Sequence, residues 1–184
     1  MVTVAVLVVL ATVAVPGLQE YVARSGMAAI RNDFSVALQR ARADAINRNT
    51  CVSLCQLAAG SQNTCAADGG NWHEGWIVHV NAACNGLVPA GALPADDIIA
   101  VRQPGNDRYQ LTQVTQGTPD PLVTFDARGT LVTGGGRFRV ADAKVTDGPN
   151  ERDIVMNRQG RVAVQAKGDD APATDEETAE AKEE

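Results

Sequence analysis

The chain begins with a segment that is apolar on every side. The run MVTVAVLVVLATVAV covers residues 1–15 without a charge, and its only polar residues are Thr3 and Thr12. A helix buried inside a water-soluble domain normally keeps one polar stripe. We therefore expect this segment to insert into a membrane or a bundle of hydrophobic helices, although it is shorter than the ~20 residues of a complete span. The positions expected to face lipid or other helices, with the proline that ends the run, are Val2, Val6, Val9, Leu10, Val13 and Pro16.

A different pattern follows Pro16. From Gly17 to about Asn49, apolar residues recur at spacings of three and four, as on one face of a helix. They are Met27, Ile30, Phe34, Leu38, Ala41 and Ala45, and the opposite face carries Arg24, Arg31, Asp33, Arg40 and Arg42. We expect one long helix whose first part, residues 1–16, is inserted in the membrane. Its second part, residues 17–49, is amphipathic and covers a soluble domain, with a kink at Pro16.

Beyond Asn49 the chain changes to short runs rich in Val, Ile, Phe or Trp and bounded by turn residues, which is typical of β-strands. The expected strands are Cys51–Leu57, Gly75–Val80, Ile98–Arg102, Leu122–Phe125, Gly136–Val140, Asp153–Asn157 and Arg161–Gln165. A hairpin turn at 157–160 separates the last two, and residues 58–71, 103–121 and 143–152 are expected loops. No helical pattern lies between the strands, so the sheet should be mainly antiparallel with the helix on one face. The predicted class is α+β, with residues 50–168 as the β-rich domain.

Four cysteines lie within a stretch of 34 residues, at positions 51, 55, 65 and 84. Their spacing does not form the two close pairs that a four-thiolate zinc site normally uses, so two disulfides are the preferred interpretation. If the first two expected strands pair antiparallel, Cys51 lies near Cys84, and Cys65 in the intervening loop lies nearest Cys55. We therefore predict Cys51–Cys84 and Cys55–Cys65. The alternatives are Cys51–Cys65 with Cys55–Cys84, and Cys51–Cys55 with Cys65–Cys84.

The negative charge of the chain is confined to its end. Residues 169–184 contain eight acidic residues and one lysine, which leaves +1 for residues 1–168 out of a formal total of −6. A body close to neutral is neither a strong nucleic-acid binder nor a polyacid. The tail has no large apolar residue, so we expect it to be disordered.

Little in the sequence points to catalysis or to a cofactor. The two histidines, His73 and His79, have no neighbouring nucleophile pattern, zincin motif or third ligand, and we expect both to be surface or hydrogen-bonded residues. The glycines at 134–136 precede a strand and not a helix, so we interpret them as a turn and not as a phosphate-binding loop. Trp72 and Trp76 are expected to pack inside the domain, with subunit contact as the alternative. We predict no enzymatic activity, no cofactor and no metal.

The first 22 residues, MVTVAVLVVLATVAVPGLQEYV, resemble the N-terminal helix of type IV pilins and type II secretion pseudopilins, including the proline after the apolar run. The later stretches ARADAINRNTCVSLC, NWHEGWIVHV, VTFDARGTL and DIVMNRQGRVAV resemble the FimT/FimU/GspH group of minor pilins and H-type pseudopilins. The resemblance covers nearly everything except the acidic tail.

This resemblance implies a structural subunit that primes or caps assembly of a type IV pilus or a type II secretion pseudopilus. It also implies a single-pass protein of the bacterial inner membrane, with the domain in the periplasm. The expected partners are other minor and major pilins or pseudopilins, the inner membrane and the assembly platform. Family members begin with a basic leader, a cleavage site and a segment containing a glutamate, so we expect Met1 to lie a few residues inside the mature segment. Prepilin peptidase would then act on the full-length precursor.

The resemblance also raises an alternative function, which is DNA binding in natural transformation. Some FimT-like minor pilins use a C-terminal Gly-Arg-x-Arg motif, and here the matching stretch is 160–163, with Ala163 in place of the second arginine. The letters of the motif do occur at 136–139, where alternation places Arg137 and Arg139 on one face of a strand. Arg137, Arg139 and Arg161 are therefore candidate DNA contacts, although a solvated strand face is the preferred interpretation.

Overall fold

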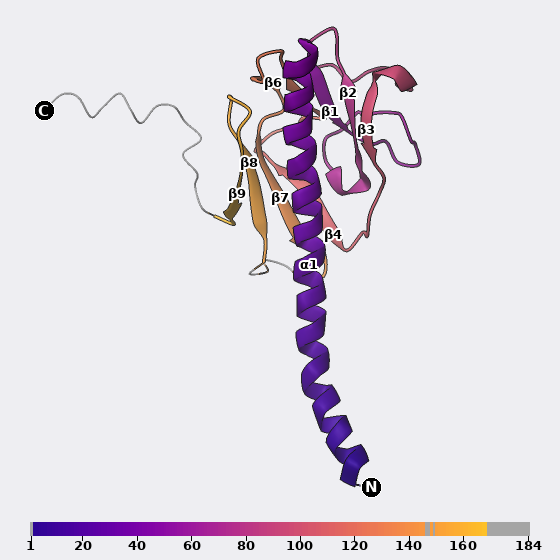
Figure 1. Cartoon of the computed structure of the whole chain (residues 1–184), viewed down its shortest axis with the longest axis vertical. Coiled ribbons are helices and arrows are strands. Elements are labelled where there is room, and N and C mark those ends of the chain that lie inside the picture. Colours follow the sequence, from indigo (N-terminus) through magenta and orange to yellow (C-terminus); the bar gives the residue numbers. More distant parts are fainter. Residues whose placement is uncertain (1, 146–147, 149, 169–184) are drawn as a thin grey trace, which may run out of the picture.

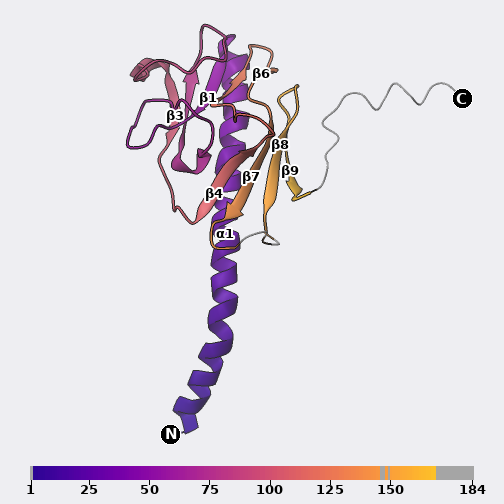
Figure 2. The same cartoon turned by 180° about the vertical axis from the view of Figure 1, so that it is seen from behind.

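A long helix, α1 (Val2–Arg48), forms the spine of the molecule, and a β domain packs against its C-terminal half (Figures 1 and 2). This computed structural model describes residues 2–145, 148 and 150–168, with the backbone alone at 2–17 and 19. The side chains of the predicted membrane segment and the predicted disordered tail lie outside the described residues. α1 passes through Pro16 as one continuous helix, and its N-terminal half curves gradually instead of breaking (Figure 1).

The end of α1 is set by a local backbone motif. Asn49 adopts a left-handed conformation with φ of 50°. The amide of Thr50 then donates to the carbonyl of Ala45 at 3.2 Å, and the amide of Asn49 donates to that of Ile46 at 3.2 Å. This pair of bonds is the Schellman motif, which satisfies carbonyls that the last helical turn leaves free. Asparagine is one of the few residues that adopt this conformation readily, so the sequence itself ends the helix here.

The β domain contains two antiparallel sheets, where the sequence predicted a single sheet. The first sheet has the order β3-β2-β1-β5-β6. Its strands are β1 (Val52–Gln56), β2 (Trp76–Val80), β3 (Ile98–Arg102), β5 (Leu122–Phe125) and β6 (Leu131–Thr133). The second sheet has the order β4-β7-β8-β9, formed by β4 (Tyr109–Val114), β7 (Gly136–Asp142), β8 (Arg152–Met156) and β9 (Val162–Ala166). Two short 3-10 turns, η1 (Trp72–Glu74) and η2 (Ala95–Asp97), precede β2 and β3.

Both sheets pack on the face of α1 that the sequence predicted to be buried. Met27, Ile30, Phe34, Leu38, Ala41 and Ala45 are all buried and belong to one core cluster with residues of both sheets. Phe34 lies among three rings, with centroids 5.0 Å from Phe138, 5.1 Å from Trp76 and 5.5 Å from Trp72. The prediction that both tryptophans pack inside the domain is therefore confirmed.

A close approach between α1 and β4 depends on a glycine. A Cβ atom added at Gly26 would lie 2.1 Å from a ring carbon of Tyr109. The hydroxyl of Tyr109 also donates to the carbonyl of Val22 at 3.3 Å. Because no side chain separates the helix from the ring at this point, Gly26 allows β4 to approach the helix.

The sequence did not predict two of the strands, and it placed the side chain of Arg42 wrongly. β4 lies inside 103–121, which was predicted to be a loop, and β6 lies between two expected strands. β4 has two buried residues, Tyr109 and Leu111, and its other residues are more exposed; it is held by pairing with β7. Arg42, placed on the solvent face of the helix, is instead half-buried, and its Nε atom donates to the carbonyl of Gly129 at 2.9 Å.

Candidate functional site

The side of α1 that faces away from the β domain carries an uncharged stripe. Nine exposed residues follow one another at alternating spacings of four and three, the spacing of a helix-packing seam. This outer stripe consists of Leu18, Val22, Ser25, Ala29, Asn32, Val36, Gln39, Ala43 and Ile46. Its larger apolar members are well exposed, with Leu18 at 64% and Val36 at 62%. The solvent-facing side of an amphipathic helix normally carries charged residues, whereas the outer stripe carries none. A surface of this kind typically packs against another helix.

The charged residues of the helix flank this stripe and are largely engaged with one another. Asp44 lies 3.6 Å from Arg40 and 4.0 Å from Arg48, while Asp33 pairs with Arg102 of β3 at 3.3 Å. The sequence predicted that the face opposite the core carries charged residues, and the structure shows that an uncharged stripe runs along the middle of that face. The outer stripe could nevertheless have been predicted from the sequence, because its nine uncharged residues recur at helical spacing from Leu18 to Ile46.

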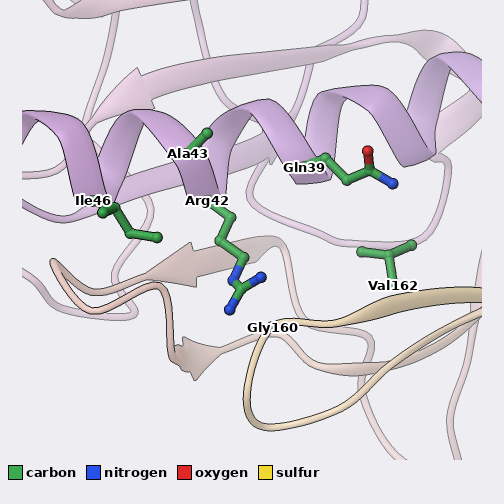
Figure 3. A pocket seen from close by; sticks show the side chains of 6 residues that line it. All are labelled: Gln39, Arg42, Ala43, Ile46, Gly160 and Val162. Carbon is green, nitrogen blue, oxygen red and sulfur yellow. The ribbon is translucent and has the colours of Figure 1, made fainter.

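The C-terminal end of the outer stripe opens into a groove beside the β8–β9 hairpin (Figure 3). The groove has a volume of about 360 Å³, and its lining residues are Gln39, Arg42, Ala43, Ile46, Gly160 and Val162. In Figure 3 the Arg42 side chain extends from the helix toward Gly160. One wall of the groove is the uncharged helix face, and in the part of the chain that the structure describes the only charged group that lines it is the Arg42 guanidinium. Such a groove suits a protein segment better than a small polar ligand.

Two of the three arginines predicted as candidate DNA contacts pair with one buried carboxylate. Asp153 is fully buried, and it accepts from Arg139 Nε at 2.8 Å and from Arg137 at 3.3 Å. The Arg139 Nη2 atom donates to the same carboxylate at 2.9 Å. Arg161 is exposed and lies just before β9, at the end of the turn of the β8–β9 hairpin. A phosphate group would therefore have to compete with Asp153 for Arg137 and Arg139.

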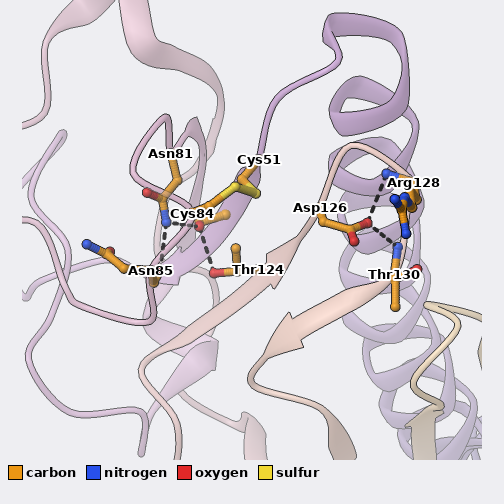
Figure 4. The surroundings of a disulfide bond; sticks show 9 residues. Cys51, Asn81, Cys84, Asn85, Thr124, Asp126, Arg128 and Thr130 are labelled. Carbon is orange, nitrogen blue, oxygen red and sulfur yellow. Dashed lines mark hydrogen bonds between the residues drawn. A yellow bond between two sulfur atoms is a disulfide. The ribbon is translucent and has the colours of Figure 1, made fainter.

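Two disulfides brace the loops on the far side of the first sheet. Cys51 is joined to Cys84 and Cys55 to Cys65, with Cα–Cα distances of 5.3 and 5.6 Å. Near the first bridge, Asn81 donates to the hydroxyl of Ser53 at 2.9 Å, and the hydroxyls of Ser53 and Thr124 share a bond of 2.8 Å (Figure 4). The bridge and this polar network together fix the loop that follows β2 to β1 and β5.

The expectation that His79 would be a surface or fully hydrogen-bonded residue was wrong. His79 is 1% exposed, and within the described part of the chain its Nε2 atom has no hydrogen-bond partner. Burial lowers the pKa of His79, an effect partly opposed by its hydrogen bond to the carbonyl of Val80 and by the charge of Asp97. Burial therefore favours the neutral form of the imidazole in the folded protein.

We expect acidification to destabilise the protein through His79. The unfolded chain protonates this residue near its ordinary pKa of about 6.5, whereas the folded chain resists protonation, so the unfolded state binds more protons. The stability contributed by neutral His79 is present above this pH and is lost below it, by up to about 1.4 kcal/mol per pH unit. Denaturation curves at several pH values should show a shallower dependence for His79→Gln. His73→Gln is the matched control and should keep the wild-type dependence.

A long N-terminal helix that extends beyond a β domain packed on its C-terminal half is the architecture of pilin-like proteins. The model of the family described as type II transport protein GspH matches residues 31–160. The chain therefore belongs to the GspH family of type IV pilin-like proteins.

Solved structures show the same fold. The type IV minor pilin FimU of Pseudomonas aeruginosa (strain PAO1) is similar with a TM-score of 0.55 and 19% identity, over 79% of this chain and 92% of FimU. A second crystal form of FimU gives a TM-score of 0.49 and 19% identity, over 73% and 88% of the two chains. No curated protein matches the chain. Within the described residues, no helix combines the length and hydropathy that a membrane span requires.

Proposed function

We propose that this protein is a minor pilin or pseudopilin whose outer stripe packs against the helices of neighbouring subunits in a filament. The observation that carries the proposal is the uncharged exposed stripe from Leu18 to Ile46, on a chain that belongs to the GspH family. Residues 2–15, whose sequence is apolar, precede the stripe on the same helix. An apolar sequence followed by an uncharged exposed stripe supports a structural role in assembly over an enzymatic one.

The proposed location before assembly is the inner membrane, with the β domain in the periplasm. Disulfides persist in that compartment and are rare in the cytosol, and the two bridges of this chain are consistent with it. Transfer of an apolar helix from lipid to a filament core costs little, whereas exposure to water costs about 25 cal/mol per Å² of apolar surface. The same helix can therefore serve first as an anchor and then as a filament contact.

Within a filament, we propose that the chain primes or caps assembly and does not form the bulk of the shaft. The support is membership of the GspH family and the shared fold with a protein described as a minor pilin. DNA binding is not part of this proposal, because Asp153 already engages Arg137 and Arg139.

The proposal is tested by placing one charge on the outer stripe. We expect Val36→Glu to reduce incorporation of the protein into sheared filaments by at least about tenfold. A carboxylate buried without a partner in a helix interface costs several kcal/mol, and 1.4 kcal/mol corresponds to a factor of ten. The amount of the subunit in the cell envelope should not change, because Val36 is 62% exposed in the folded chain.

The matched control is Val132→Glu in β6, where the native valine is 45% exposed and lies away from the stripe. This variant should be incorporated like the wild type. Normal incorporation of Val36→Glu, at wild-type envelope levels, would show that the outer stripe does not contact other subunits.

A further inference from the structure

A compact group of three metal-binding side chains lies on the face of the first sheet away from α1. Cys55 projects from β1, His79 from β2 and Cys65 from the loop between these strands. Their ligand atoms all lie within 4.8 Å of one another, and all three residues are buried, at 0%, 1% and 6% exposure for Cys55, His79 and Cys65. The outer stripe, the groove and the core around Phe34 make no use of this group.

A hydrogen bond determines which ring nitrogen of His79 can bind a metal ion. Its Nδ1 atom lies 3.0 Å from the carbonyl oxygen of Val80, which can only accept, so Nδ1 carries the proton. Nε2 therefore presents a lone pair, and it has no hydrogen-bond partner among the described residues. A buried polar atom without a partner costs about 1–3 kcal/mol, so one that persists calls for an explanation.

We propose that Cys55, Cys65 and His79 form a binding site for zinc or a chemically similar divalent ion when the Cys55–Cys65 disulfide is reduced. A phosphine reductant supplies two electrons and becomes a phosphine oxide with an oxygen atom from water. The two protons of that water convert the disulfide sulfurs into two thiols. The metal ion then displaces both thiol protons to the solvent. Two thiolate sulfurs and the Nε2 lone pair occupy three positions, and water can fill the fourth.

The surroundings of the group fit this chemistry. Two thiolates neutralise a divalent ion, so the loaded site carries no net charge, which an apolar environment tolerates better than an isolated ion. The neighbouring side chains are the buried Leu57, Ile77, Leu93 and Leu122. Zinc binds thiolates at about 2.3 Å and imidazole at about 2.0 Å. Ligand atoms that already lie within 4.8 Å of one another therefore need only small side-chain movements to reach a common ion.

The hydrogen bond to Val80 adds a further element of a metal site. A metal-binding histidine usually donates its other ring N–H to a carbonyl or carboxylate, which fixes the tautomer and the direction of the free nitrogen. The Val80 carbonyl does this for His79. Thiolate and imidazole ligands also select zinc over magnesium or calcium, which prefer oxygen.

The test uses the full chain with Cys51→Ala and Cys84→Ala, so that Cys55 and Cys65 are the only thiols. A phosphine reduces the protein, the reductant is removed under inert gas, and Co²⁺ is titrated as a spectroscopic probe. We expect one equivalent to bind, with the intense thiolate-to-cobalt absorption and the visible bands of a tetrahedral site. Competition with Zn²⁺ should abolish this spectrum, and the oxidised protein should give none.

Two histidine variants distinguish a metal site that includes His79 from metal binding by the two thiols alone. His79→Gln in the same background should weaken Co²⁺ binding at least about tenfold, the lower end of what a perturbed metal site typically loses, while His73→Gln should bind like the parent. Far-UV circular dichroism establishes that each reduced variant is folded. The proposal is overturned if the folded, reduced parent binds no Co²⁺, or if His79→Gln binds it as tightly as the parent with the same spectrum.

Discussion

Replacing Phe34 by alanine should lower the free energy of unfolding by about 3–5 kcal/mol. Phe34 is fully buried, and its ring lies within 5.5 Å, centre to centre, of Trp72, Trp76 and Phe138. It is also the point at which α1, the first sheet and the second sheet meet, since Trp76 belongs to β2 and Phe138 to β7. The cavity left by the substitution would have rigid aromatic walls, which can collapse only partly.

Chemical denaturation of the detergent-solubilised chain, followed by fluorescence of the two buried tryptophans, measures this loss. Val36→Ala is the matched control, because Val36 lies two residues further on but is 62% exposed. Its expected effect is within about 0.5 kcal/mol of the wild type. If the two variants had equal stability, the packing of the helix on the sheets described here would be wrong.

Removing the Cys51–Cys84 bridge is the second change with a large expected effect. The two cysteines are separated by 33 positions, and the chain-entropy relation for such a closed loop gives a loss of about 3–4 kcal/mol. Cys51→Ala with Cys84→Ala should therefore lower the denaturation midpoint substantially. The reason is that the unfolded chain gains conformational freedom when the cross-link is absent.

The second bridge provides an internal comparison. Cys55 and Cys65 are separated by 10 positions, so Cys55→Ala with Cys65→Ala should cost less, about 2–3 kcal/mol. The loop closed by Cys55–Cys65 lies inside the loop closed by Cys51–Cys84. Because the entropy of closure depends only on the logarithm of loop length, the two effects should still be nearly additive in the quadruple variant. Peptide mapping without reduction should recover both pairs, and any cross-link between Cys55 and Cys84 would contradict the structure.

The sequence by itself determined the elements whose patterns are local. The spacing of Met27, Ile30, Phe34 and Leu38 identifies the buried face of α1, because helical periodicity places these residues together whatever lies opposite. Asn49 ends the helix through its own backbone conformation. The β8–β9 hairpin was likewise predicted from its turn residues. The outer stripe could have been predicted in the same way, because its residues recur at the same helical spacing on the opposite side of α1.

Only the tertiary structure decided the features that depend on distant partners. β4 is a strand because β7 supplies its hydrogen bonds, and its short alternation inside a stretch rich in turn residues did not indicate this. Asp153 binds Arg137 and Arg139 because register places Asp153 opposite Arg139. Burial of His79 beside Cys55 and Cys65 depends on a loop folding back over the sheet. Local periodicity reports which side of an element is apolar, but hydrogen bonds, ion pairs and burial across elements depend on which segments meet, and that is set only when the chain has folded.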